Sequence, residues 1–288
     1  MTSEGEKRSV RFDRDLQIEA YRFQGVEQRF PNHFHPYYVI GLIEQGERRL
    51  FCGQMEWLVG PGDLLLFQPL VSHACEAVDG KPLDYRCLNI KPEVMARTAC
   101  TLDIPDAGGG LIAFSQPVVL KAPPELTAAL RELHQGIMGE TGDRLLREEQ
   151  YLLLMERILG LYGGTLQAED RGQDGVARVC EYLERHCGQR IGLEDLEGLA
   201  GMGRYRLIRE FTRQRGITPY RYLEAARISA AKGLLERGME PIEAAAEAGF
   251  SDQSHFTNAF KAQIGLTPKQ YQRIFEEKNP KPDKDKGR

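Results

Sequence analysis

The chain has 288 residues, 41% of which are hydrophobic, and its formal net charge is −4 at pH 7. This length allows two domains with separate cores, and no apolar run approaches the ~20 residues of a membrane-spanning helix. The polar segment 1–14 is unlike a secretory signal, and the six cysteines contain no Cys-x-x-Cys pair, so we expect a reduced, cytoplasmic protein. The thiols are expected to be packed side chains, with redox sensing as the alternative.

The first 90 residues predict a β-rich domain behind a charged N-terminal segment. Residues 1–17 are expected to form a mobile tail, with an arm folded over a ligand site as the alternative. From residue 18 to 90, short β-rich runs alternate with Gly, Pro and Asp turns, a pattern typical of a sandwich or a closed barrel. The predicted strands are 37–43, 48–52, 55–59, 64–67, 73–78 and 85–90.

Three of the six histidines, His33, His35 and His73, lie in this β-rich part. In an extended segment His33 and His35 point to the same side, and Pro36 favours that conformation for His35. A small barrel has room for one small ligand. The three side chains could hydrogen-bond such a ligand, could bind a metal ion, or could be packed for structural reasons only.

Further ligand-binding candidates lie on the neighbouring predicted strands. Each could equally be an ordinary residue of a sheet face, because the internal face is not readable without the strand register. These candidates are Tyr38, Arg49, Trp57 and Glu76.

From residue 123 the periodicity becomes helical. One helix is predicted to end near Gly139, with Leu126, Leu130, Leu133 and Ile137 at intervals of three and four. A second is predicted over 143–161. Its apolar stripe consists of Leu145, Leu152, Met155, Leu159 and Tyr162. One stripe could cover the barrel and the other pair across a dimer, or both could pack within the monomer.

The Gly-rich, polar segment 164–175 is predicted to be an interdomain linker, and the charged segment 277–288 a disordered tail. Residues 174–288 hold 20 of the 38 Lys and Arg and 17 of the 42 Asp and Glu, a net charge of +3, whereas residues 1–173 carry −7. Five arginines lie between Arg204 and Arg215. A charge run is commonly a solvated helix face, but this run coincides with a predicted DNA-reading helix.

Two copies of a helix-turn-helix pattern follow the linker. In the second copy an alanine-rich helix over 242–248 ends at Gly249, and Ser251 or Asp252 can cap the next helix. Phe256 and Phe260 are four residues apart, so both fall on its core-facing side.

The first copy comprises residues 193–200, a turn at 201–203 and a helix over 204–215, with Leu207 and Phe211 at the same spacing. Each copy is followed by Gly-x-Thr-Pro, at 216–219 and 265–268, which ends one helix and starts the next. An amphipathic helix over 219–237 is predicted to connect the copies. The expected mini-cores are Leu199, Met202, Leu207 and Phe211 in the first copy, and Phe250, Phe256 and Phe260 in the second.

Residues 176–276 resemble the DNA-binding domain of AraC/XylS transcriptional regulators, and the sequence from Gly249 to Phe256 is close to the signature of that family. The resemblance implies that the connecting helix holds two recognition helices for successive major grooves. The strand order over 1–163 resembles the cupin-like effector domain of the same family, with Pro61-Gly62-Asp63 and His73 in its second motif.

The predicted fold class is therefore α+β with two domains, a cupin-like barrel and an all-α domain with two helix-turn-helix units. The resemblance implies a DNA-binding transcriptional regulator that responds to a small-molecule effector. It further implies double-stranded DNA as a partner, RNA polymerase as a possible one, and a homodimer.

The candidates for contacts with base edges in the first unit are Tyr205, Ile208 and Arg209. Arginine can bond guanine O6 and N7, and Tyr or Ile can contact a thymine methyl. Arg204 and Arg213 are candidates for phosphate contacts.

The matched positions in the second unit are Gln253, Ser254, His255, Thr257 and Asn258, with Lys261 as a phosphate candidate. Gln253 and Asn258 can pair with adenine N6 and N7.

Three departures from the resembled families stand out. Gly203 replaces a usual N-cap Ser, Asn258 replaces a frequent Arg, and Val39 and Ile40 stand where enzymatic cupins carry Glu. The second functional hypothesis is a metal-dependent cupin enzyme fused to a DNA-binding domain. A third is a regulator whose N-terminal domain only dimerises or binds protein. No catalytic triad or phosphate-binding Gly loop is present in the sequence, so we assign neither an enzymatic activity nor a cofactor, and a metal ion remains a weaker alternative at the three histidines.

Overall fold

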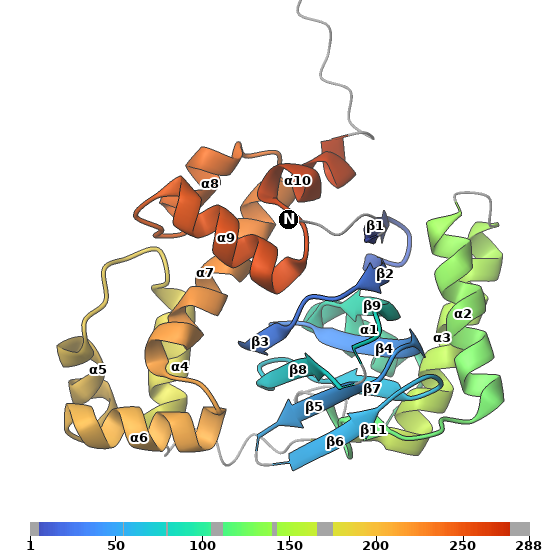
Figure 1. The fold of residues 1–288 in the computed structure, drawn as a ribbon, viewed down its shortest axis with the longest axis horizontal. Helices are drawn as coiled ribbons and strands as arrows, with labels where there is room; N and C mark the ends of the chain where they lie inside the picture. Colours follow the sequence, from blue (N-terminus) through green and yellow to red (C-terminus); the bar gives the residue numbers. More distant parts are fainter. Residues whose placement is uncertain are drawn as a thin grey trace, which may run out of the picture.

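The computed structural model describes residues 6–53, 55–78, 80–104, 112–139, 143–165 and 175–276. It contains a β-rich N-terminal domain and an all-helical C-terminal domain that lies along one side of it (Figure 1). None of the described helices is both long and apolar enough to cross a bilayer. The predicted C-terminal tail 277–288, residues 1–5 of the predicted N-terminal tail and residues 166–174 of the predicted linker lie outside the described residues.

Two antiparallel sheets form the β-rich domain. The larger has the strand order β1-β2-β9-β4-β7-β11 and the smaller β3-β8-β5-β6, while β10 pairs with β12. Strands far apart in sequence are thus neighbours, as a cupin-like fold requires. The strands are β1 (Lys7–Asp13), β2 (Ile18–Val26), β3 (Phe30–His33), β4 (Tyr38–Gln45), β5 (Arg48–Cys52), β6 (Met55–Val59), β7 (Leu64–Phe67), β8 (His73–Ala77), β9 (Leu83–Ile90), β10 (Ile112–Phe114), β11 (Val118–Val119) and β12 (Gly163–Thr165).

The larger sheet is buried on both faces. Ile40 and Leu42 pack in the core beneath the helices of this domain, whereas Val39 and Ile43 pack in the core that faces the smaller sheet. Successive side chains of a strand point to opposite faces, so a strand buried on both sides reads as a continuous apolar run. This explains the unbroken apolar segments in β4 and β7.

Helices α1 (Pro92–Thr101), α2 (Pro124–Met138) and α3 (Arg144–Tyr162) belong to this domain. The Asp143 carboxylate caps α3 by accepting from Leu145 N at 2.8 Å. Leu130 and Ile158 are fully buried in the core of the sheet and helices. Leu145, which we expected on the packed stripe, is instead 72% exposed because it lies in the first turn, outside the buried face.

Three segments of this domain differ from expectation. Residues 7–13, predicted to be part of a mobile tail, form β1, which pairs with β2 from Lys7↔Gln24 to Asp13↔Ile18. Phe12 packs against Phe275 of the C-terminal domain at 5.3 Å between ring centroids, so contacts distant in sequence order this charged strand. Helix α1 was not predicted from the sequence, and β12 overlaps the start of the predicted linker.

The helical domain follows the predicted pattern. Its described helices are α4 (Gly175–Arg185), α5 (Leu193–Ala200), α6 (Arg204–Arg215), α7 (Pro219–Glu236), α8 (Pro241–Glu247), α9 (Gln253–Ile264) and α10 (Pro268–Glu276). Asp252 caps α9 by accepting from His255 N at 2.7 Å. Gly216 and Gly265 end α6 and α9 with φ of 71° and 86°, a conformation that favours glycine.

The mini-cores lie where the spacing predicts them. Leu207 and Phe211 are fully buried in the first unit, and Phe256 and Phe260 in the second. Phe250 is also buried, while Leu199 and Met202 are partly buried against the first core. The long helix α7 contributes to both cores, because Tyr222 lies in the first and Ile228 in the second.

Candidate effector cavity and DNA-reading surface

A cavity of about 100 Å³ lies between the two sheets of the β-rich domain. Most of its wall is apolar or aromatic, including Phe23, Leu65 and Phe67. Part of the wall comes from the other domain, since Gln263 and Ile264 at the end of α9 also line it. The second predicted recognition helix is therefore in direct contact with the cavity.

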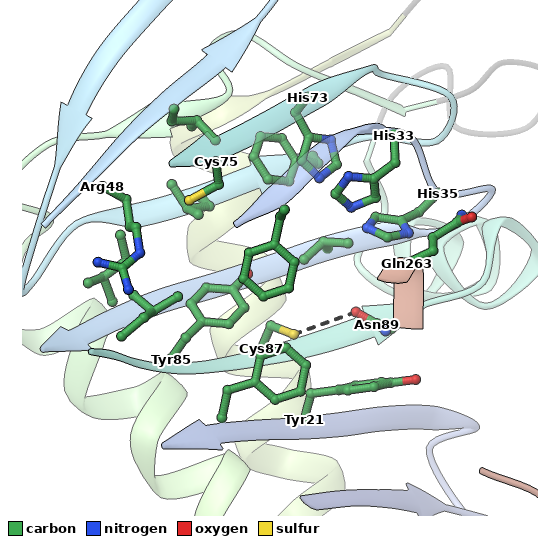
Figure 2. A pocket seen from close by; sticks show the side chains of 18 of the residues that line it. Tyr21, His33, His35, Arg48, His73, Cys75, Tyr85, Cys87, Asn89 and Gln263 are labelled. Carbon is green, nitrogen blue, oxygen red and sulfur yellow. Dashed lines mark hydrogen bonds between the residues drawn. The ribbon is translucent and has the colours of Figure 1, made fainter. Parts of the chain in front are cut away.

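The three histidines gather at one end of this cavity, and Arg48 lies at the other (Figure 2). The ring centroid of His33 lies 4.7 Å from that of His35 and 4.5 Å from that of His73. His33 ends β3, His35 follows it and His73 begins β8, so the pairing of these two strands brings the rings together. The geometric expectation that His33 and His35 point to one side agrees with this arrangement.

Burial keeps the three imidazoles neutral. Removal from water lowers the pKa of His73 to about 3 and holds the pKa of His35 well below its usual range. Burial also lowers the pKa of His33, against the hydrogen bond to the Pro31 carbonyl, which raises it. Neutral imidazoles can accept hydrogen bonds or bind a metal ion at pH 7.

The other predicted ligand-binding residues lie outside the cavity wall. Tyr38 points into the core beneath the helices and donates to Ile112 O at 2.9 Å, and Glu76 forms an ion pair with Arg29. Arg49 pairs with Glu56 at 3.1 Å, and Trp57 packs beside the core without lining the cavity.

For three of these positions the cavity residue is the immediate sequence neighbour. Tyr37, Arg48 and Cys75 line the wall in place of Tyr38, Arg49 and Glu76. A shift of one residue moves a side chain to the opposite face of a sheet. In β4 no apolar alternation separates the two faces, because this strand is buried on both sides.

Arg48 is almost completely buried, with 1% of its surface exposed. Its guanidinium donates to Glu47 O, Lys81 O and Val26 O at 2.8, 3.0 and 2.9 Å. Three carbonyls satisfy hydrogen bonds but bring no full negative charge, so this end of the cavity is electropositive.

The segment around β3 has two functional faces. His33 and His35 face the cavity, whereas Asn32 and Phe34 face the helical domain. Asn32 donates to Gly216 O at 2.6 Å. The Phe34 ring is 1% exposed and stacks on Tyr222 at 4.4 Å between centroids, inside the core of the first helix-turn-helix unit.

The β-rich domain also contacts the far end of α9. Arg8 of β1 donates to Gly265 O at 3.0 Å, and Gln263 donates to Phe34 O at 3.0 Å. Together with the bond from Asn32 to Gly216, these contacts hold the C-terminal ends of both predicted recognition helices.

A buried ion pair joins the two domains beside the cavity. Lys232 Nζ of α7 lies 2.7 Å from Glu19 Oε2 of β2, and the two side chains are 7% and 6% exposed. Tyr271 of α10 donates to the Glu19 carboxylate. Asn89, which lines the cavity, donates to Glu19 at 3.4 Å. We call Glu19, Lys232 and Tyr271 the interdomain latch.

The cavity touches this latch from two sides. Besides Asn89, the cavity residue Tyr37 has its ring centroid 4.2 Å from Lys232 Nζ, within the range of a cation–π contact. Burial raises the pKa of the Glu19 carboxyl, but Lys232 and the hydrogen bonds outweigh it, so its pKa is lowered below the usual range.

In the first unit the predicted DNA-reading side chains are accessible. Tyr205 is 76% exposed, Arg209 is exposed and Ile208 is half-exposed. Arg213 pairs with Glu210 at 2.9 Å. Arg204 pairs with Glu197 at 2.8 Å, and Glu197 Oε1 also accepts from Arg204 N at 3.2 Å. Glu197 therefore supplies the helix cap that Gly203 cannot provide.

In the second unit Gln253, Ser254, Asn258 and Lys261 are exposed and Thr257 is half-exposed. His255 is half-buried and differs from the others, because its Nε2 lies 3.0 Å from Glu224 Oε1 of α7. The side chains that point outward from α9 are thus polar, as expected, and the His255 ring is turned toward α7.

A helical domain with two such units and a β-rich domain with an internal cavity define a ligand-responsive DNA-binding protein. Residues 15–155 match the family model of the AraC-like ligand binding domain, and residues 198–274 match a helix-turn-helix domain. The HTH-type transcriptional regulator YbfI of Bacillus subtilis is 48% identical over 88% of this chain and 90% of its own length. The chain belongs to the AraC family of transcriptional regulators.

More distant comparisons agree. The transcriptional activator RhaS of Klebsiella pneumoniae is 25% identical over 84% of this chain and 87% of its own length. The structure of ToxT from Vibrio cholerae O395 has the same fold, with a TM-score of 0.57 at 15% identity over 90% of this chain and 97% of ToxT. Another ToxT structure, with a TM-score of 0.55 at 14% identity over 95% of this chain and 97% of ToxT, is bound to an unsaturated fatty acid.

Proposed function

We propose that the cavity between the sheets is the effector site of this regulator. The observation that carries the proposal is that Gln263 and Ile264, at the end of the second recognition helix, form part of the cavity wall. A ligand in the cavity would contact both domains. The apolar wall between a histidine cluster and a buried arginine suits a small, mainly apolar molecule with polar groups at its ends, and the fatty acid bound to ToxT is an organic ligand held by the same fold.

We propose that occupancy changes how the two helix-turn-helix units are held. His33 and His35 face the cavity, while Asn32 and Phe34, which alternate with them along the segment, contact the first unit. Gln263 connects the cavity to the second unit. A ligand shifts such an equilibrium only by its differential affinity for the two arrangements, and a few kcal/mol are sufficient.

The proposal is tested with full-length protein and promoter fragments from its own genomic neighbourhood. Compounds that raise the melting temperature should change the affinity for DNA, measured by fluorescence anisotropy. Replacing Cys75 by Phe should fill the cavity and abolish both effects, whereas Cys75→Ser, which keeps its volume, should retain them. Compounds that bind with equal affinity to wild type and Cys75→Phe would place the effector elsewhere.

The exposed side chains of α6 and α9 are proposed to read the DNA. Arg209→Ala is expected to weaken binding to the cognate site by about 1–3 kcal/mol and to relax discrimination at one base pair, because a bidentate contact to guanine is lost. Anisotropy titrations with single-base variants of the site measure both effects. An equal loss on every sequence would instead identify Arg209 as a phosphate contact.

Arg213 is proposed to contact a phosphate after its exposed ion pair with Glu210 opens, since such a pair contributes little stability. Arg213→Ala should reduce the slope of log K against log salt by about one unit, as one fewer counterion is released. Arg185→Ala, which removes an exposed arginine of α4, is the control and should leave the slope unchanged. The same slope in Arg213→Ala as in wild type would contradict the assignment.

Exposed Leu146 and Leu153 lie seven residues apart on α3, which favours the proposal that this helix pairs across a homodimer. We further propose that the protein acts in the cytoplasm as a regulator without enzymatic activity, and that RNA polymerase is a partner when it activates transcription.

A further inference from the structure

We propose that His33, His35 and His73 bind one divalent first-row transition-metal ion such as Zn²⁺. One ring nitrogen from each of the three side chains lies within 4.8 Å of the other two. The metal site itself is independent of effector control, whereas its regulatory consequence rests on the function proposed above.

The hydrogen bonds of two rings leave one nitrogen of each free for a metal. His33 Nδ1 lies 2.7 Å from Pro31 O, and His73 Nδ1 lies 3.0 Å from Val71 O. A carbonyl oxygen only accepts, so in both rings Nδ1 carries the proton and Nε2 keeps its lone pair. Histidines that bind metal ions show this arrangement, in which the second nitrogen donates to a carbonyl or carboxylate.

The third ring has an unsatisfied atom. His35 Nδ1 is buried without a hydrogen-bond partner among the described residues. Buried polar atoms are nearly always satisfied by protein groups, water or an ion. Coordination of His35 would place this ring against an ion instead of leaving it in an apolar wall.

The spacing suits a small ion after modest ring rotations. With Zn–N distances near 2.0–2.1 Å, two ligands of a tetrahedral ion are about 3.3–3.4 Å apart. The ring centroids of His35 and His73, the widest pair, lie 5.2 Å apart. The ammonium of Lys232, on the same side of the domain, is paired with Glu19 at 2.7 Å, so its charge is compensated.

Three neutral ligands would leave the ion its full charge and one open position toward the cavity. An anionic or neutral donor group of a small molecule could occupy that position. Because His33 and His35 flank Phe34, the ion would also fix the segment that contacts the first helix-turn-helix unit.

The test uses full-length protein freed of metal with a chelator. Zn²⁺ is titrated in competition with a chromophoric chelator, and Co²⁺ is followed by its visible absorption. Wild type should bind one ion per chain. His35→Gln and His73→Gln should bind it more weakly by at least the roughly 10–100-fold that loss of an outer-shell partner costs, because each removes a ligand itself. His186→Gln is the matched control, because His186 lies at the end of the α4 region beside Tyr182 and outside the cavity.

Circular dichroism shows whether each variant is folded. If His73→Gln is unstable, the Co²⁺ spectrum of His35→Gln alone tests whether the histidines bind the metal. Folded wild type that binds less than one ion per chain would overturn the metal site, as would unchanged affinity in the histidine variants. DNA affinity is measured in parallel with and without Zn²⁺. An effect of organic compounds without metal binding would leave the proposed function intact, and metal binding without any change in DNA affinity would contradict only the regulatory consequence.

Discussion

Replacing Lys232 by methionine is expected to destabilise the docking of the two domains by about 3–5 kcal/mol, because Glu19 is left as a buried charge without its partner. The pair is almost fully buried and lies at 2.7 Å. Lys232 and Glu19 come from different domains, so the loss falls mainly on the interface. Urea unfolding followed by circular dichroism and by the fluorescence of Trp57, the single tryptophan, measures the change in each domain.

The double variant Glu19→Gln with Lys232→Met is the control. Glutamine keeps an acceptor for Tyr271 and removes the buried charge, so most of the lost stability should return. If the double variant is as unstable as the sum of the two single variants, the pair contributes only packing.

The effect of pH follows from the lowered pKa of Glu19 in the folded protein. A carboxyl with a depressed pKa stabilises the folded state above its unfolded pKa, and this contribution is lost as the pH falls through the folded pKa. The latch should therefore be complete at pH 7 and weaken below about pH 4.5. In Lys232→Met the ammonium that lowers the pKa of Glu19 most is gone, so burial, which raises the pKa, is opposed only by the hydrogen bonds from Tyr271 and Asn89. The folded-state pKa should therefore be higher in the variant, and the difference in stability from wild type should shrink toward acidic pH.

Phe34→Ala is expected to weaken the contact between the β-rich domain and the first helix-turn-helix unit by about 3–5 kcal/mol, the usual cost of truncating a buried phenylalanine. The ring is 1% exposed and lies in the core of the other domain, stacked on Tyr222. DNA binding should persist in this variant, because the reading residues of α6 and α9 are elsewhere, but it should no longer respond to the effector.

Phe30→Ala, at the start of β3, provides the comparison from the same segment. Phe30 lines the cavity, so its truncation should change ligand affinity while the docked arrangement and the coupling to DNA are retained. Proteolysis of the interdomain segment and anisotropy titrations with and without effector distinguish the two variants. An effector response in Phe34→Ala equal to that of wild type would show that the coupling does not pass through the contact that Phe34 makes just after β3.

The helix-turn-helix units could be predicted almost to the residue because their signals are local. Predicted helices over 193–200 and 204–215 agree with α5 and α6. The caps at Asp252, Gly216 and Gly265 depend on a few adjacent residues, and the spacing of Phe256 and Phe260 reports the buried face directly. The strand boundaries between residues 48 and 67 were predicted equally well, since Gly and Pro turns separate them.

The cavity could be predicted only in part. The three histidines were found because the spacing of two of them fixes their common side. Tyr38, Arg49 and Glu76 each missed the cavity by one residue, and Trp57 has no neighbour in the cavity wall. For Tyr38 the reason is that β4 is apolar on both faces and shows no alternation from which to read the register. The role of Lys232 was missed because Glu19 lies 213 residues away in the chain, and no local pattern connects them.

The sequence alone thus determined the elements and the family of domains to which they belong, because caps, turns and periodicity act over a few neighbouring residues. Tertiary structure decided which side of each strand faces the cavity and how the regulatory and DNA-binding domains meet. Those outcomes depend on pairing and burial between distant segments. Glu19, Phe34 and Gln263 acquire their roles only when the two domains pack together.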